Sequence, residues 1–310
     1  MSRTLFNLCF AAVFLTGPAY ADRPQVAVDI APVHSLVAQV MDGIAAPDLI
    51  IQPGATPHEY SLRPSEAAAL QSADIVFWIG PDLTPWLAEA IETLAPTAAL
   101  TPLLDVDGAI QLEFRNNAVF KAHDHSNHDD HDGHDVHGAH DPHAWLSPKN
   151  AMTWLDVIAS RLSDLDPVNS DAYLANAASG RAAIEALMDD VETTLAAVCG
   201  REFIVFHDAY QYFETDFDFP APGAISMSDA SDPSPSRIAE IRGEIAEHGV
   251  SCVLAEPQFN PGLVTTVLRG SDARMGIADP LGAELQLGPK FYPQLIRSLS
   301  SSITECMRSD

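Results

Sequence analysis

Short, continuous apolar runs recur along this chain, with helical or loop segments between them. Runs of this kind are typical of parallel strands that are buried on both faces, because the crossover helices of a parallel sheet cover both of its sides. Three runs lie early in the chain and three lie late: 25–30, 48–52 and 73–80, then 202–207, 251–257 and 274–280. We therefore predict an α/β fold with two lobes, each a mainly parallel sheet flanked by helices.

A long helical pattern separates the two sets of runs. Apolar side chains recur every three or four residues from Tyr173 to Val198, after the start signal Pro167 and before the stop signal Gly200. A helix of this length extends roughly 45 Å at 1.5 Å per residue, long enough to pass along both lobes as one rigid bridge. The alternative is one helix of a single domain, because the pattern shows an apolar face and not what it packs against.

The predicted order of the chain is therefore lobe, bridge, lobe. The boundaries that we expect are 22–166 for the N-terminal α/β lobe, 167–200 for the linking helix and 201–310 for the C-terminal α/β lobe.

The first 21 residues differ from the rest of the chain. They hold one basic residue, Arg3, an apolar run from Leu5 to Leu15, and small residues at Ala19 and Ala21. This pattern is typical of a secretory signal peptide, here cut after Ala21. The run is too short for the roughly 30 Å of hydrocarbon that a membrane anchor must span. We expect the mature chain to be exported and soluble.

The charge balance is strongly acidic. Against 43 Asp and Glu the chain has 16 Lys and Arg, a formal net charge of −27. Such a charge repels nucleic acid and anionic membrane surfaces and attracts cations. It excludes DNA binding, although solubility alone would also explain an acidic surface.

Between about 116 and 141 the apolar periodicity disappears, and histidine, aspartate and glycine take over. Too little apolar surface is present to offset the entropy of ordering, so we predict a disordered insertion in the first lobe. Closely spaced imidazoles in a flexible segment can hold cations weakly in several geometries and release them near pH 6. The alternative is a solvated charge run without function. The histidines of this auxiliary metal loop are His123, His125, His128, His131, His134, His137 and His140.

Other histidines lie where predicted strands end. His58 follows the run 48–52, and His207 ends the run 202–207. Asp279 comes late in the last run, and His143 precedes an expected helix. Ligands of parallel α/β sheets bind beyond the carboxyl ends of the strands. Three neutral imidazoles with a carboxylate or water suit tetrahedral Zn²⁺, whereas Mn²⁺ favours more oxygen donors.

Four further polar residues have simpler interpretations. His34 has the spacing of a packing or capping residue in an amphipathic helix, and His248 precedes a helix-stop glycine. Glu59 and Asp208, next to His58 and His207, are expected to orient a histidine or to lie on the surface.

Five segments, in order along nearly the whole mature chain, resemble the periplasmic zinc-binding component of the bacterial high-affinity zinc ABC transporter, a family of metal-binding solute-binding proteins. The segments are "QPGATPHEYSLRPSEAAALQSADIVFWIGPDL", "DPHAWLSPKNA", "FIVFHDAYQYFE", "CVLAEPQFNP" and "RMGIADPLG". The resemblance implies two α/β lobes bridged by one long helix, with the metal in the cleft between them and modest closure. The histidine-rich insertion also sits where zinc-binding members carry theirs.

The resemblance carries a ligand set onto this sequence. It implies His58 in "PHEY", His143 in "DPHAW" and His207 in "FHDAY". Related manganese binders place a glutamate where this chain has His207, which favours zinc. Some zinc members use a glutamate directly before the first histidine, where this chain has Pro57, which cannot coordinate. The fourth ligand is then Asp279 or water, and we expect Asp279.

The cysteines indicate one disulfide. Cys199, Cys252 and Cys306 lie outside the predicted signal peptide, and an exported chain meets oxidising conditions, but spacing does not choose the pair. The resemblance implies Cys252 with Cys306, which leaves Cys199 as a free thiol.

These expectations combine into a function. We predict a monomeric solute-binding protein of the periplasm that captures Zn²⁺, does no chemistry on it, and delivers it to a membrane permease with a cytoplasmic ATPase. A periplasmic zinc metallochaperone is a candidate for loading it. The alternatives are a manganese- or iron-binding protein or adhesin of the same fold, and a zinc hydrolase with Glu59 as its base. Against the hydrolase, the histidine-rich tract has no flanking apolar strands to hold ligands rigidly.

Overall fold

The computed structural model describes residues 23–115, 140–226, 233–259 and 261–308. The predicted signal peptide and the tract histidines from His123 to His137 lie outside these residues, whereas His140 lies within them. The predictions made for those two segments are therefore not tested by the structure.

The first half of the chain forms a parallel four-stranded sheet in the order β2-β1-β3-β4. Its middle strands β1 and β3 are buried throughout, as their continuous apolar runs predict. Sequence analysis did not predict β4, an edge strand in which two of four residues are exposed. The strands are β1 (Val26–Val28), β2 (Asp48–Leu49), β3 (Ile75–Trp78) and β4 (Ala99–Pro102), and the helices between them are α1 (Ala31–Val40), α2 (Pro64–Ser72) and α3 (Pro85–Leu94).

The second half forms another parallel four-stranded sheet, in the order β6-β5-β7-β8. β5 and β7 are fully buried, but β8 pairs with β7 at the edge of the sheet, and Met275 and Ile277 are exposed there. The apolar run 274–280 therefore predicted the strand β8 correctly, but this strand is not buried on both faces as such a run indicates. The strands are β5 (Phe203–His207), β6 (Ala224–Ser226), β7 (Cys252–Ala255) and β8 (Arg274–Ile277), and the shorter helices of this half are α6 (Gln211–Phe217), α7 (Pro235–His248) and α8 (Pro261–Leu268).

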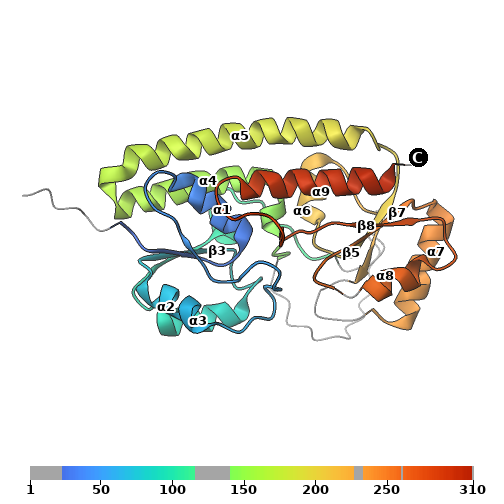
Figure 1. Cartoon of the computed structure of the whole chain (residues 1–310), viewed down its shortest axis with the longest axis horizontal. Helices are drawn as coiled ribbons and strands as arrows, with labels where there is room; N and C mark the ends of the chain where they lie inside the picture. The colour runs from blue at the N-terminus through green and yellow to red at the C-terminus, as the bar shows by residue number, and fades with distance from the viewer. Residues whose placement is uncertain (1–22, 116–139, 227–232, 260, 309–310) are drawn as a thin grey trace, which may run out of the picture.

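Three long helices of the described chain pack together beside the two sheets (Figure 1): α4 (Pro148–Leu165), α5 (Ser170–Ala196) and α9 (Phe291–Met307). α5 runs along both lobes, which confirms the predicted bridging helix, and a 3-10 turn at Pro167–Asn169 precedes it. α9 lies beside α5 and packs against α1 of the first lobe and against β7 and β8 of the second. The bridge is therefore a layer of packed helices rather than a single rod.

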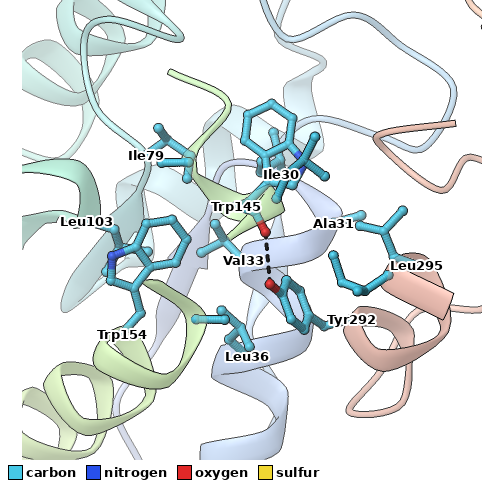
Figure 2. Close-up of a cluster of buried hydrophobic side chains, with 14 of the residues drawn as sticks. Ile30, Ala31, Val33, Leu36, Ile79, Leu103, Trp145, Trp154, Tyr292 and Leu295 are labelled. Atoms are coloured by element: carbon cyan, nitrogen blue, oxygen red, sulfur yellow. Dashed lines mark hydrogen bonds between the residues drawn. The ribbon is translucent and has the colours of Figure 1, made fainter. Parts of the chain in front are cut away.

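The hydrophobic core crosses from one lobe to the other. One cluster of buried side chains extends from the first sheet through α4, α5 and α9 to the second sheet, and a smaller cluster lies between the second sheet, α7 and α8. Figure 2 shows Trp145 and Tyr292 within the large cluster, beside Val33 and Leu36 of α1. The Tyr292 hydroxyl donates to the carbonyl oxygen of Trp145 at 3.0 Å. This bond ties the segment around residue 145 to α9.

A disulfide joins the second sheet to the bridging layer. Cys252 of β7 is bonded to Cys306 of α9, with the two Cα atoms 5.6 Å apart, which confirms the predicted pair. Cys199 is an exposed free thiol. Across the described residues, each helix is too short or too polar to cross a lipid bilayer.

Candidate metal centre

His58 lies in the loop between β2 and α2. The loop is anchored one residue earlier, where the buried Pro57 accepts a hydrogen bond on its carbonyl oxygen from Nε1 of Trp86 at 2.9 Å. The His58 side chain itself is half-buried. The exposed Glu59 beside it points to the surface interpretation of that residue rather than to an orienting role.

His143 is buried, and a carboxylate holds its ring. Nδ1 of His143 lies 2.7 Å from Oδ1 of Asp141, and the backbone N–H of His143 donates to the same oxygen at 3.0 Å. The Asp141 carbonyl accepts from the hydroxyl of Tyr212, on α6 of the second lobe, at 2.9 Å. A carboxylate at Nδ1 keeps the proton on that nitrogen, so the lone pair of the neutral ring lies on Nε2.

His207, the last residue of β5, is held in the same way. Its Nδ1 lies 2.7 Å from Oε1 of Glu256, a buried residue that directly follows the neighbouring strand β7. The parallel pairing of β5 with β7 brings the two residues together across 49 positions of sequence. The Nε2 of this ring is therefore also the atom that is available as a metal ligand.

The structure brings the three predicted histidines together. Nε2 of His207 and Nε2 of His143 are 3.4 Å apart, and the ring centroids of His58 and His143 are 5.7 Å apart. Two nitrogens bound to one tetrahedral Zn²⁺ at 2.0–2.1 Å lie about 3.3 Å apart. Among the described residues, however, no three His, Cys, Asp or Glu side chains are close enough to hold an ion as they stand. His143 and His207 form a preformed pair, and His58 is the ligand that has to approach.

A small cavity lies among these rings, with ≈ 20 Å³ of room, enough for about one water molecule or ion. Its walls combine the polar groups above with apolar and aromatic side chains, which come from the end of β5 and from loops of both lobes. Trp145 closes one side, and its Nε1 donates to the carbonyl oxygen of Pro280 at 2.8 Å. The lining residues are Thr56, Pro57, His58, His143, Trp145, His207, Glu256, Gln258, Phe259, Pro280 and Leu281.

Asp279 follows β8 next to this cavity but does not line it. Its Oδ1 accepts from Nε2 of Gln258 at 2.9 Å and from the backbone N–H of Leu281 at 3.0 Å. Its Oδ2 accepts from the backbone N–H of Ala283 at 2.6 Å. The structure does not bring Asp279 together with the three histidines, and its role as a ligand stays a prediction.

Asp208 has a different partner from the one expected. Its carboxylate pairs with the guanidinium of Arg115, which also binds Glu214 of α6 at 2.7 Å. Burial raises the pKa of both carboxyl groups, and Arg115 opposes that rise. Asp208 therefore joins the segment before the histidine-rich tract to the second lobe and does not orient His207.

The described segments on either side of residues 116–139 lie close to the cavity. The backbone N–H of Asp141 donates to the carbonyl of Leu112 at 2.8 Å, which pairs the segment before the tract with the segment after it. The backbone N–H of His140 donates to Oδ2 of Asp82 at 3.1 Å. Residue 140, the last histidine of the tract, is thus fixed to the first lobe close to His143.

Two further histidines of the described residues, His34 and His248, lie in helices. His34 is buried in α1, where burial lowers its pKa. His248 ends α7 and is followed by Gly249 at φ 63°, which confirms the predicted helix end.

Sequence analysis missed the two carboxylates that hold the histidines. Glu256 lies near the end of the predicted run 251–257, so the rule that selected residues at the ends of predicted strands would have selected it too. Asp141 was counted with the acidic residues of the tract, although it lies only two residues from His143.

Known proteins resemble this chain over nearly its whole length. The family model described as "ZnuA: Zinc-uptake complex component A periplasmic" matches residues 26–306. The high-affinity zinc uptake system protein ZnuA of Brucella abortus (strain 2308) is 40% identical over 98% of this chain and 99% of its own length. That of Paracoccus denitrificans (strain Pd 1222) is 39% identical over 98% of both chains.

Solved structures share the fold. A crystal structure of ZnuA superposes with a TM-score of 0.76 at 22% identity, covering 93% of this chain and 100% of the other. The protein FpvC from Pseudomonas aeruginosa, in complex with Mn²⁺, superposes with a TM-score of 0.75 at 19% identity, covering 92% and 99%. FpvC has also been solved with a Ni²⁺ ion, so a protein of this fold is found with more than one transition metal.

Proposed function

Because the chain belongs to the family of periplasmic zinc-uptake component A proteins, we propose that it captures one Zn²⁺ between its lobes and delivers it to the membrane permease of an ABC-type importer. Members of this family are solute-binding transport proteins and not enzymes, which removes the zinc hydrolase as an alternative. The observation that carries the proposal is the His143–His207 pair, whose Nε2 atoms lie 3.4 Å apart with both Nδ1 atoms held by buried carboxylates.

Binding replaces the water around the ion with imidazole nitrogens. His143 and His207 form the fixed half of the site, and His58 closes it from the loop after β2. Three neutral imidazoles leave the charge of the ion uncompensated. The carboxylates of Asp141 and Glu256, each in contact with the Nδ1 of one ring, supply two negative charges close by. Such carboxylates also raise the basicity of the ligands. The fourth position goes to an oxygen, for which the candidates are Asp279 and water.

The approach of His58 is the step that we assign to closure of the lobes. Its loop belongs to the first lobe, whereas His207 belongs to the second, so a small movement of one lobe toward the other shortens the distance between them. The continuous core across the bridging helices allows only a modest movement.

The ligand set supports zinc over manganese. Three nitrogen donors suit Zn²⁺, and Mn²⁺ prefers carboxylate and water oxygens. Competition of Mn²⁺, Fe²⁺ and Ni²⁺ against Zn²⁺ in equilibrium titrations tests this choice, and preference for another metal would overturn it.

The histidine-rich tract is proposed to collect further zinc ions weakly and to pass them to the cavity, which lies near the described segments on either side of residues 116–139. We also propose that the protein acts as a monomer in the periplasm after loss of residues 1–21. A periplasmic zinc metallochaperone stays a candidate partner.

The decisive experiment is zinc titration of the metal-free protein, by calorimetry and by metal analysis after dialysis. A variant that lacks 122–139 keeps Asp141 and should retain one tight site while the weaker sites vanish. His207→Ala should abolish the tight site, and the matched replacement His248→Ala, at the far end of α7, should leave it unchanged. Tight zinc binding that survives His207→Ala would refute the proposed site.

A further inference from the structure

Gln258 places a carboxamide in the wall of the cavity, beside the three histidines. Its Nε2 donates to Oδ1 of Asp279 at 2.9 Å. This bond defines the orientation of the group, because an amide oxygen in that place would face the negative carboxylate. The carbonyl oxygen Oε1 is therefore the end that is turned away from Asp279.

Oε1 of Gln258 is buried, and no protein group in the described part of the chain donates a hydrogen bond to it. A buried acceptor without a partner is unfavourable, because it has lost its hydrogen bonds to water and gained none in return. The nearby indole N–H of Trp145 cannot serve, since it already donates to Pro280. Two further side chains that line the cavity, Phe259 and Leu281, have no donor group. An occupant of the cavity that carries a donor hydrogen would satisfy this oxygen.

Asp279 is arranged to hold Gln258 rather than to reach an ion. Both of its oxygens accept hydrogen bonds from backbone N–H groups, of Leu281 and Ala283, in the turn that follows. To coordinate a metal directly, the carboxylate would have to give up part of this set. Its remaining hydrogen bond fixes the Gln258 carboxamide.

Building on the proposed capture of zinc, we propose that Gln258 is a positioning residue for the fourth ligand. Its Oε1 accepts a hydrogen bond from a water molecule bound to the ion, and Asp279 acts through Gln258 and not as a ligand. A water bound to Zn²⁺ is a strong hydrogen-bond donor, because the ion makes its protons more acidic. The choice between Asp279 and water thus falls on water, and Gln258 determines where that water sits.

The test compares Gln258→Met with Asp279→Asn, using Zn²⁺ affinity and the visible absorption of bound Co²⁺, which reports the ligands around the ion. Methionine keeps the volume of glutamine but has no strong acceptor, so Zn²⁺ affinity should fall about tenfold and the Co²⁺ spectrum should change. Asparagine at 279 keeps an oxygen that accepts from Gln258, so the Co²⁺ spectrum should stay that of the unmodified protein, with a smaller loss of affinity.

Two results would overturn the inference: a Gln258→Met protein with unchanged affinity and spectrum, or an Asp279→Asn protein with the larger loss and an altered spectrum, as a direct ligand requires. Circular dichroism and melting of the metal-free variants check the fold. If Gln258→Met melts far below the unmodified protein, Gln258→Asn, which keeps the amide but withdraws it from the cavity, must show the same changes.

This inference and the proposed function fail separately. If the unmodified protein has no tight zinc site, or if His207→Ala keeps it, the proposed function fails whatever the Gln258 variants do. If those two proteins behave as expected and Gln258→Met binds like the unmodified protein, only the role of Gln258 is lost.

Discussion

The carboxylate of Glu256 lies 2.7 Å from Nδ1 of His207, and both side chains are buried. His207 ends β5 and Glu256 directly follows the neighbouring parallel strand β7, so the sheet itself sets the orientation of the imidazole. Any metal bound at Nε2 of His207 depends on this pair, because the carboxylate holds the proton on the opposite nitrogen.

Glu256→Gln is expected to weaken zinc binding about 10- to 100-fold, the usual effect of losing a carboxylate behind a metal-binding histidine. The amide keeps the size of the side chain but removes the charge and can face Nδ1 with its NH₂ group. Calorimetric titration measures the change. Glu59→Gln, an exposed replacement in the same part of the molecule, is the control. Equal affinities for the two variants would show that the Glu256 carboxylate does not support the ligand.

Arg115→Met is expected to destabilise the protein by about 3–5 kcal/mol, since it leaves the carboxylates of Asp208 and Glu214 buried without their cation. Urea unfolding of the metal-free protein measures the loss. The control is Arg181→Met, which breaks an exposed pair with Asp156 and should cost about 0–1 kcal/mol. Similar losses in both variants would mean that burial adds nothing to the Arg115 cluster.

Gly180→Val should disturb the bridging layer. A Cβ atom at Gly180 in α5 would lie 2.9 Å from Cδ1 of Leu155 and 3.0 Å from Cγ of Gln39, so either these side chains must shift or α5 must move away from α4 and α1. Overpacking of this kind costs about 1–3 kcal/mol. Gly243→Ala in α7 is the contrast, because no atom lies within 4 Å of its Cβ and alanine favours helix by about 0.5–1 kcal/mol. Thermal melting should shift in opposite directions for the two variants.

Asp29 should make the metal-free protein less stable as the pH rises toward neutrality. Complete burial raises the pKa of this carboxyl from 3.8 to about 7, although the N–H groups of Ile30 and Ile79 donate to it. The folded state therefore binds the proton more tightly than the unfolded state. This contribution is full below the unfolded pKa and is lost as the pH passes through about 7.

The free energy of unfolding should accordingly fall by about 2–3 kcal/mol between about pH 5 and pH 8, at about 1.4 kcal/mol per pKa unit. Urea unfolding at a series of pH values measures the slope. Asp29→Asn should flatten it, whereas Asp42→Asn, at an exposed position, should keep it. An unchanged slope in Asp29→Asn would show that the carboxyl titrates at its ordinary pKa.

Sequence patterns predicted a large part of this architecture. The six apolar runs each contain an observed strand, and the periodic stretch after Pro167 contains α5. These features are local: a buried strand must be apolar over its whole length, and a packed helix must repeat its apolar face every turn. The edge strands β4 and β6 were missed because short or half-exposed strands carry little of that signal.

The candidate site also combines residues that the sequence indicated with contacts that only the structure shows. Sequence alone proposed His58 and His207 as ligands because they follow or end predicted strands, and His143 because it lies in a family motif. The structure brings the three side chains around one cavity, and their role as ligands stays a prediction. Only the tertiary structure showed that the Nε2 atoms of His143 and His207 face each other and that Asp141 and Glu256 orient the two rings. It also showed that Asp279 accepts a hydrogen bond from Gln258. Apart from Asp141 and His143, which are two residues apart, these contacts join residues across many positions of sequence. They are decided by the packing of two lobes through a shared core, which no local pattern records.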